Sequence, residues 1–209
     1  MTKYKLIMKN IFCVLFFFPF VLIAQQDNST LRWGVEGGLN LSIFRSQTES
    51  FHSSTGVKPD MYMGFFAINQ FLEETDLKLS ASYSRQGSYI QEQNTTKHTI
   101  TIDYISFGNV WKVGVWRSIY LDVGLVLDVV INNPSVPFLN SSNLKGKIGG
   151  TFFLTNKIAL ELSVKESFSG IHNHLMKQIP PFDGYMSNRV FQFGLIYFFK
   201  PYEQKAIFK

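Results

Sequence analysis

The chain has 209 residues, of which 45% are hydrophobic and 16% aromatic, and its formal net charge is +5. This length suits a single domain. Three lysines and no acidic residue lie in the first 24 positions, so residues 25–209 carry a net charge of only +2. Since no face or helix collects Lys and Arg into a patch, the composition argues against a nucleic-acid partner.

Residues 1–24 have the layout of a secretory signal peptide. Three lysines precede an apolar run at 11–23, and Ala24 is followed by polar residues. The run is shorter than the roughly 20 residues that a transmembrane helix needs. We therefore expect export and cleavage after Ala24. The single cysteine, Cys13, lies inside the run, so we expect no lipid anchor, disulfide or thiolate metal site in the mature chain.

Eight later segments alternate apolar and polar residues, which is the period of a β-strand. They cover residues 31–44, 61–71, 76–88, 97–111, 118–130, 144–154, 157–168 and 189–199. The fifth is the clearest, because every odd position from Ile119 to Val129 is apolar while the even positions include Asp122 and Asp128. The second is apolar on both faces and is weaker evidence.

The fourth segment is less regular than the others. Ile100, Ile102 and Tyr104 alternate with Thr99, Thr101 and Asp103, and the pattern then blurs at 105–108. We expect the apolar set to face lipid and Asp103 to face the interior, with a β-bulge at 105–108 that re-aims the side chains.

The connections between segments alternate in length. Long polar connections (45–60, 89–96, 131–143 and 169–188) alternate with short ones (72–75, 112–117 and 155–156). This alternation is typical of outer-membrane barrels, whose two ends face different compartments. The sequence therefore predicts an all-β fold, an eight-stranded antiparallel up-and-down transmembrane β-barrel at 25–199, in the outer membrane, with both termini in the periplasm and a short periplasmic tail at 200–209.

Three strand patterns resemble the PorT-like outer-membrane β-barrel family of bacteria with type IX secretion. Residues 33–42 resemble its opening strand, 82–87 its third and 188–195 its last. The resemblance covers about residues 31–199 and rests on strand patterns. It implies a barrel whose named relative is a secretion and motility factor, not an enzyme.

The predicted inward positions carry charges of both signs. They include Glu36, Lys78, Asp103, Asp122, Asp128, Glu161 and Lys165, together with Lys145 and Lys147 if the odd positions of the sixth segment face inward. The interior of an eight-stranded barrel is just wide enough for its own side chains, so charges there have to pair or stay hydrated. We interpret them as a structural network. A proton or ion path, or a paired-carboxylate acid and base, is the alternative.

Aromatic residues near the short connections predict an interfacial girdle. They are Trp33, Phe71, Trp111, Trp116 and Phe199, and two of them flank the turn at 112–117 beside basic residues. Aromatic rings favour the membrane interface because one edge can be wet and the other apolar. The alternative is that large aromatics are simply common in strands.

Candidate reactive residues lie in or near the long connections. His52, His98, His172 and His174 are there, and an extended loop could bring His172 and His174 to one metal ion. Ser167 and Ser169 lie close to His172, which leaves open a serine-based lipid-modifying enzyme. We expect solvated histidines, with no catalytic residue, metal or cofactor.

The expected role is a non-enzymatic scaffold or accessory component of the cell envelope. Its expected partners are outer-membrane lipid and other envelope or secretion proteins, including those of type IX secretion. The prolines at 134, 137, 180 and 181 either stiffen the long connections or form a binding surface. A lipid-modifying enzyme, a narrow pore and a soluble ligand-binding barrel are the competing functions.

Overall fold

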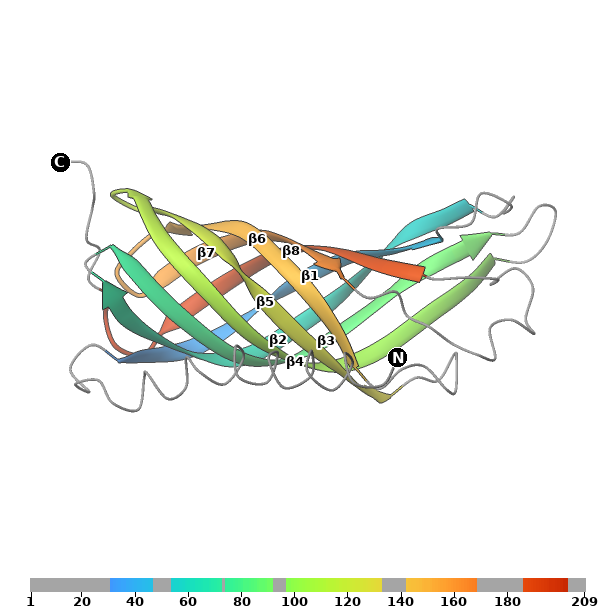
Figure 1. Cartoon of the computed structure of the whole chain (residues 1–209), viewed down its shortest axis with the longest axis horizontal. Coiled ribbons are helices and arrows are strands. Elements are labelled where there is room, and N and C mark those ends of the chain that lie inside the picture. The colour runs from blue at the N-terminus through green and yellow to red at the C-terminus, as the bar shows by residue number, and fades with distance from the viewer. Residues whose placement is uncertain are drawn as a thin grey trace, which may run out of the picture.

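A computed structural model shows eight strands that form a closed antiparallel barrel (Figure 1). It describes residues 31–46, 54–72, 74–91, 97–132, 142–168 and 186–202. The strands are β1 (Arg32–Ser46), β2 (Ser54–Leu72), β3 (Thr75–Gln91), β4 (Lys97–Trp116), β5 (Ile119–Asn132), β6 (Ser142–Phe153), β7 (Ile158–Ser167) and β8 (Met186–Phe198). Each strand pairs with the next along the chain, and β8 pairs with β1. The predicted fold class is confirmed.

The predicted signal peptide and most of the predicted tail lie outside the described residues. None of the residues that the structure describes belongs to a helix long and apolar enough to cross a membrane.

The barrel wall is apolar outside and polar inside. On β5, Leu121 and Val123 are exposed, while Asp122 and Asp128 are fully buried. On β8, Phe193 and Leu195 face outward and Gln192 faces inward. A closed sheet leaves no strand edge unpaired, and this inside-out distribution places apolar side chains against lipid. The wall therefore has the form of a transmembrane barrel.

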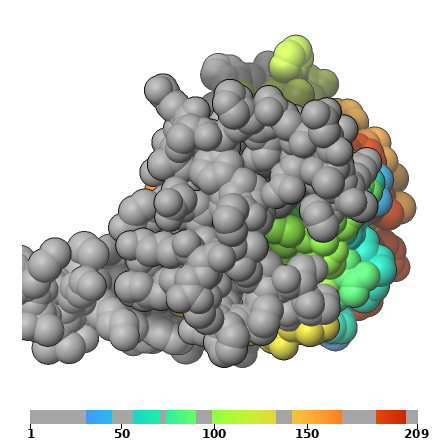
Figure 2. Space-filling model, turned by 90° about the vertical axis from the view of Figure 1, so that its right-hand side faces the viewer, coloured from blue at the N-terminus to red at the C-terminus, as the bar shows by residue number. Residues whose placement is uncertain are grey.

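The strands on one side of the barrel are much longer than those on the other. β2, β3 and β4 contain 19, 17 and 20 residues, whereas β6 and β7 contain 12 and 10. About 9–11 residues are enough to cross a bilayer. Because the short turns lie at one membrane surface, the additional residues of β2, β3 and β4 extend past the membrane at the other surface. Figure 1 shows the ends of these strands beyond the end of β8, and Figure 2 shows the strands side by side.

The first half of β4 has the opposite phase from the one that the sequence predicts. Ile100, Ile102 and Tyr104 are buried in the barrel interior, and Asp103 shares the outer face with Arg85, its partner in the register. The expected lumen position of Asp103 is therefore wrong. This part of β4 extends past the bilayer, where the outer face meets water and does not need apolar side chains.

The predicted bulge at 105–108 is also wrong. The β3–β4 register is continuous from Thr75↔Val113 to Gln91↔Lys97. Irregularities occur instead on the β5 side of β4, between Asp103 and Tyr104 and between Gly114 and Trp116. The pattern blurs at 105–108 because the interior side of β4 is itself partly apolar, from Ile100 to Val110.

Candidate functional site

An apolar plug closes the barrel interior at the short-turn end. It consists of Phe66, Ile68, Tyr120, Phe153, Ala159, Ile196, Phe198 and Tyr202. Tyr202 follows β8 and folds back into the barrel mouth, where its ring stacks on Phe153 at 4.4 Å between centroids. Its backbone nitrogen donates to the carbonyl of Asn156 at 2.6 Å. The short-turn end is thus filled by side chains from several strands.

Polar contacts fix Tyr202 in the plug. Its hydroxyl donates to the Asp76 carboxylate, and the Arg32 guanidinium lies over its ring at 5.4 Å. Arg32 also donates from Nε to the carbonyl of Pro201 at 3.1 Å. Burial, with a further contribution from the Asp76 charge, raises the pKa of Tyr202, so its hydroxyl stays protonated and can donate.

Two sets of ion pairs occupy the interior, and both are linked to Glu161. In the first set, Lys112 contacts both oxygens of Asp122 at 2.8 and 2.9 Å and donates to Thr151. In the second set, Lys78 bridges Glu36 and Glu161, with a distance of 2.8 Å to Glu161. Since Lys78 belongs to β3 and Glu161 to β7, this contact crosses the interior.

Among the described residues of the interior, Glu161 is the carboxylate that lies close to the most lysines. Besides Lys78, it accepts from Lys147 at 2.6 Å, and Lys112 lies 3.7 Å away. Lysines from three strands thus converge on one carboxylate of β7, and each contact ties a separate part of the wall to that strand.

A third polar set, built around one ion pair, occupies the interior further along the strands. Asp128 binds Lys145 at 2.7 Å and accepts from Ser106 at 2.6 Å and from Gln86 at 3.1 Å. The Gln86 amide oxygen accepts in turn from Lys145 and from Asn188. This set joins β3, β4, β5, β6 and β8, so the interior is cross-linked along much of its length.

The charges of the interior balance in the described part of the chain. The inward lysines are Lys58, Lys78, Lys112, Lys145, Lys147 and Lys165, and the inward carboxylates are Glu36, Asp60, Asp76, Asp122, Asp128 and Glu161. Ionised groups removed from water have to be paired and hydrogen-bonded, and breaking one buried pair costs about 3–5 kcal/mol. Among the described contacts, five of these six lysines are ion-paired, Lys165 being the exception, and this pairing is chemically suited to a fixed, side-chain-filled interior.

Most of the predicted lumen residues meet in these sets. Glu36, Lys78, Asp122, Asp128 and Glu161 are all ion-paired there.

Lys165 also faces inward and is buried, but it differs from the other lysines. Its ammonium lies 5.9 Å from the ring centroid of Tyr62, and it makes no ion pair with any described residue. The Tyr62 hydroxyl is buried as well and has no hydrogen-bond partner among the residues that the structure describes. Lys145 and Lys147 also face the interior, so the odd positions of the sixth predicted segment point inward.

Sequence reasoning missed several interior charges. Lys112 was expected in a turn, but β4 continues to Trp116 and turns Lys112 into the interior. The alternation Val110, Lys112, Gly114 on the even positions was the available signal. Lys58 and Asp60 were missed because β2 begins at Ser54, within the range expected to be a long connection, and they form a pair at 2.5 Å.

The aromatic residues at the short-turn end do not all lie at one level. Trp33 and Phe199 contact each other at 4.7 Å between ring centroids, and Trp116 is 62% exposed at the end of β4. Trp111 pairs with Leu77 and Val123 within the wall, so it does not flank the turn as expected. The Phe71 side chain lies outside the described residues.

The candidate reactive residues are only partly described. The Ser167 hydroxyl donates to the carbonyl of Asn188 at 3.0 Å and accepts from Asn143 at 2.8 Å, so it is bound into the wall. Ser169 and three of the histidines lie outside the described residues, and His98 is described only by its backbone in β4. Within the described ranges, no cluster of His, Cys, Asp or Glu could hold a metal ion.

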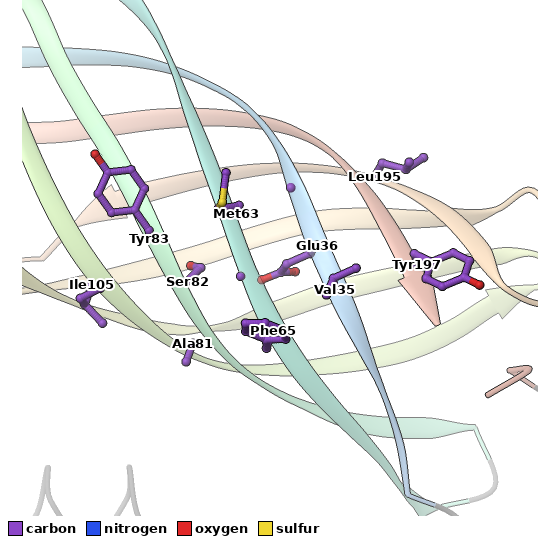
Figure 3. Close-up of a pocket in the computed structure, with 12 residues that line it drawn as sticks. Val35, Glu36, Met63, Phe65, Ala81, Ser82, Tyr83, Ile105, Leu195 and Tyr197 are labelled. Atoms are coloured by element: carbon purple, nitrogen blue, oxygen red, sulfur yellow. The ribbon is translucent and has the colours of Figure 1, made fainter. Parts of the chain in front are cut away.

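The outer wall carries an apolar groove of about 650 Å³ across β8, β1, β2, β3 and β4. Its outward lining residues are Val35, Gly37, Met63, Phe65, Ala81, Tyr83, Ile105, Leu195 and Tyr197. Figure 3 shows Tyr83 and Tyr197 toward opposite ends, with Met63 and Phe65 between them. The small residues Gly37 and Ala81 leave the wall hollow between larger side chains.

A polar cluster adjoins this groove on the same outer face. Asp103 accepts from the Tyr83 hydroxyl at 2.7 Å, from Arg85 Nε at 2.8 Å and from Asn132 at 3.2 Å. The Arg85 side chain is 41% exposed, whereas the Asp103 side chain is 6% exposed. The carboxylate is thus covered by its donors while the guanidinium remains accessible.

Known proteins resemble the chain in structure and not in sequence. No protein-family model matches it, and no curated protein sequence does either. The solved structure of Neisserial surface protein A matches 79% of the chain and 96% of its own length, with a TM-score of 0.51 and 11% identity. At this identity the match shows a shared fold.

Two further barrels match with lower scores. They are the attachment invasion locus protein Ail of Yersinia pestis (TM-score 0.45, 10% identity, 80% of this chain and 98% of that one) and OprG of Pseudomonas aeruginosa (TM-score 0.43, 13% identity, 81% and 94%). The inside-out wall described above, together with the fold shared with Neisserial surface protein A, carries the assignment. The chain is an eight-stranded antiparallel β-barrel of the outer membrane.

Proposed function

We propose that the protein is a non-enzymatic, non-conducting scaffold of the outer membrane that acts on other envelope proteins through its two ends. The observation that carries this proposal is the filled interior. The aromatic plug occupies the short-turn end, the Lys78–Glu161 ion pair crosses the space above it, and Lys145 contacts both Asp128 and Gln86 further along the interior. An eight-stranded barrel has little room left once its side chains fill it.

The chemistry of the described interior supports a structural role over an enzymatic one. Glu36, Asp122, Asp128 and Glu161 each contact a lysine, and such pairing fixes a carboxylate in place. A general acid or base needs a proton that it can exchange with a substrate. The wall hydrogen bonds of Ser167 likewise engage the hydroxyl that a serine mechanism would use.

The projecting wall formed by β2, β3 and β4 is the surface we assign to a partner. These strands extend past the membrane at the end of the long connections, which we place outside the cell. Sites on a rigid scaffold beyond the bilayer are well placed to contact other proteins. From the strand patterns at 33–42, 82–87 and 188–195, we further propose that the partner belongs to type IX secretion.

Single-channel recording tests whether the barrel is closed. Purified protein inserted in a planar bilayer is expected to give no discrete conductance steps in potassium chloride. An unrelated open porin in the same bilayer serves as the positive control. Regular steps from the wild-type barrel would contradict the non-conducting part of the proposal.

Site-specific photo-crosslinking tests the scaffold role. A photoreactive residue at Thr99, which is exposed on the projecting part of β4, is expected to capture one envelope protein in native membranes. The same residue at Leu162, which is 59% exposed on the lipid-facing wall, is the control and is expected to capture lipid. Capture of a protein from another envelope system would support the scaffold role and refute the proposed link to type IX secretion. Identical products from both positions would refute the scaffold surface.

A further inference from the structure

The outer-wall groove and the polar cluster beside it have the two chemical parts of a lipid-binding site. We propose that the groove binds an acyl chain of an anionic lipid and that Arg85 binds the phosphate of its headgroup. The groove is lined by apolar side chains such as Met63, Phe65 and Ile105, and Tyr83 belongs both to its lining and to the polar cluster.

Arg85 lies at the level where headgroups are expected. Thr75 begins β3 at the short-turn end, and Arg85 follows it by about ten residues. Tilted strands of this kind gain about 2.5 Å along the barrel axis per residue, so the two residues are about 25 Å apart in height, which is the height of the apolar band of such barrels. The groove therefore lies in the hydrocarbon layer, with Arg85 at its border on the side of the long connections.

The cluster presents Arg85 in a form that suits a phosphate. Asp103 takes the Nε of Arg85, and the hydroxyl of Tyr83 and the amide of Asn132 fix Asp103 in turn. Besides Asp103, the guanidinium interacts with the Tyr83 hydroxyl, and the Arg85 side chain is still 41% exposed, so part of the group is accessible to a ligand. An accessible guanidinium can bind the oxygens of a phosphate through charge-assisted hydrogen bonds.

The opposite side of the barrel has a second arginine, Arg189, at the same level. A comparison of the two sites favours Arg85 as the one that binds an anionic headgroup. Arg189 binds Glu166 above a smaller groove of about 460 Å³. The Glu166 side chain is 39% exposed, so its charge would repel an anionic headgroup, whereas Asp103 is covered. A free phosphate ion would bind only weakly at Arg85, because the adjacent Asp103 carboxylate offsets the charge of the guanidinium. Binding needs the acyl chain in the groove as well.

Lipid retention measured by native mass spectrometry tests the proposal. The barrel is reconstituted in vesicles of three parts phosphatidylethanolamine to one part phosphatidylglycerol and extracted in mild detergent. We expect the wild type to retain phosphatidylglycerol in preference to phosphatidylethanolamine. Arg85→Gln is expected to lower that preference about tenfold, since it removes a charge-assisted contact with the headgroup. Ala81→Phe fills the groove and is expected to lower the retention of both lipids.

Matched variants separate this site from general effects. Arg189→Gln removes the same charge at the same level, and Val123→Phe adds bulk to a lipid-facing position outside the groove. Both are expected to retain lipid as the wild type does, and heat-modifiable gel mobility shows that each variant is folded. An unchanged preference in Arg85→Gln, or an equal loss in Arg189→Gln, would overturn the headgroup site. Unchanged retention in Ala81→Phe would overturn the acyl groove.

Discussion

Replacement of Lys78 by methionine tests whether the interior ion pairs stabilise the barrel. Lys78 is fully buried, contacts Glu36 and Glu161, and has its ammonium 5.3 Å from the ring centroid of Phe66. Glu161 keeps Lys147 at 2.6 Å, but Glu36 loses its only described ion pair. One buried carboxylate is left without a counter-charge, so we expect the free energy of unfolding to fall by about 3–5 kcal/mol.

Urea unfolding in lipid vesicles, followed by tryptophan fluorescence and by heat-modifiable gel mobility, measures this loss. The double variant Lys78→Met with Glu36→Gln removes both charges, and we expect it to recover at least about 1 kcal/mol relative to the single variant. Lys200→Met removes an exposed lysine and is expected to stay within about 0.5 kcal/mol of the wild type. A loss below about 1 kcal/mol for Lys78→Met would mean that water solvates Glu36, and the argument for a filled interior would fail.

Three further changes test other parts of the structure. Tyr202→Ala removes the ring that stacks on Phe153, so we expect a loss of about 3 kcal/mol in urea unfolding, and an unchanged midpoint would show that the plug is not stabilising. Trp116→Ala is expected to lower stability by about 1–2 kcal/mol in bilayers and by less in short-chain detergent micelles; equal losses in the two would argue against an interfacial role. Tyr62→Phe removes a buried hydroxyl without a described partner and is expected to leave the urea midpoint unchanged or raised, whereas a loss above about 1 kcal/mol would reveal a hydrogen bond to that hydroxyl.

The inside and outside of the wall could be predicted from sequence wherever a strand lies in the membrane. On β5 and β7, lipid contact requires apolar residues on one face, and the interior accepts Asp122 or Glu161 on the other. The same constraint is lost on the part of β4 beyond the bilayer. There Ile100 faces inward and Asp103 lies on the outer face, covered by its hydrogen-bond donors, so the apolar face no longer identifies the lipid side.

The parts of the site that escaped prediction depend on contacts between distant residues. The alternation of Val110, Lys112 and Gly114 is compatible with a strand, but Gly114 close to aromatic residues suits a turn equally well, so the local pattern alone does not place Lys112 in β4. Tyr202 lies beyond the last alternating segment, and its place in the plug follows from Phe153, Asn156 and Asp76, which come from other parts of the chain. The groove was not predicted either, since it depends on which strands stand next to one another.

The position of Tyr202 has a consequence for the order of assembly. Its contacts reach Arg32 at the start of β1, Asp76 at the start of β3 and Asn156 in the turn before β7. Those three sites come together only when β8 has paired with β1 and closed the barrel. Docking of this ring is accordingly a late event in folding, and a fluorescent reporter near residue 202 would register completion of the cylinder rather than the pairing of any single hairpin.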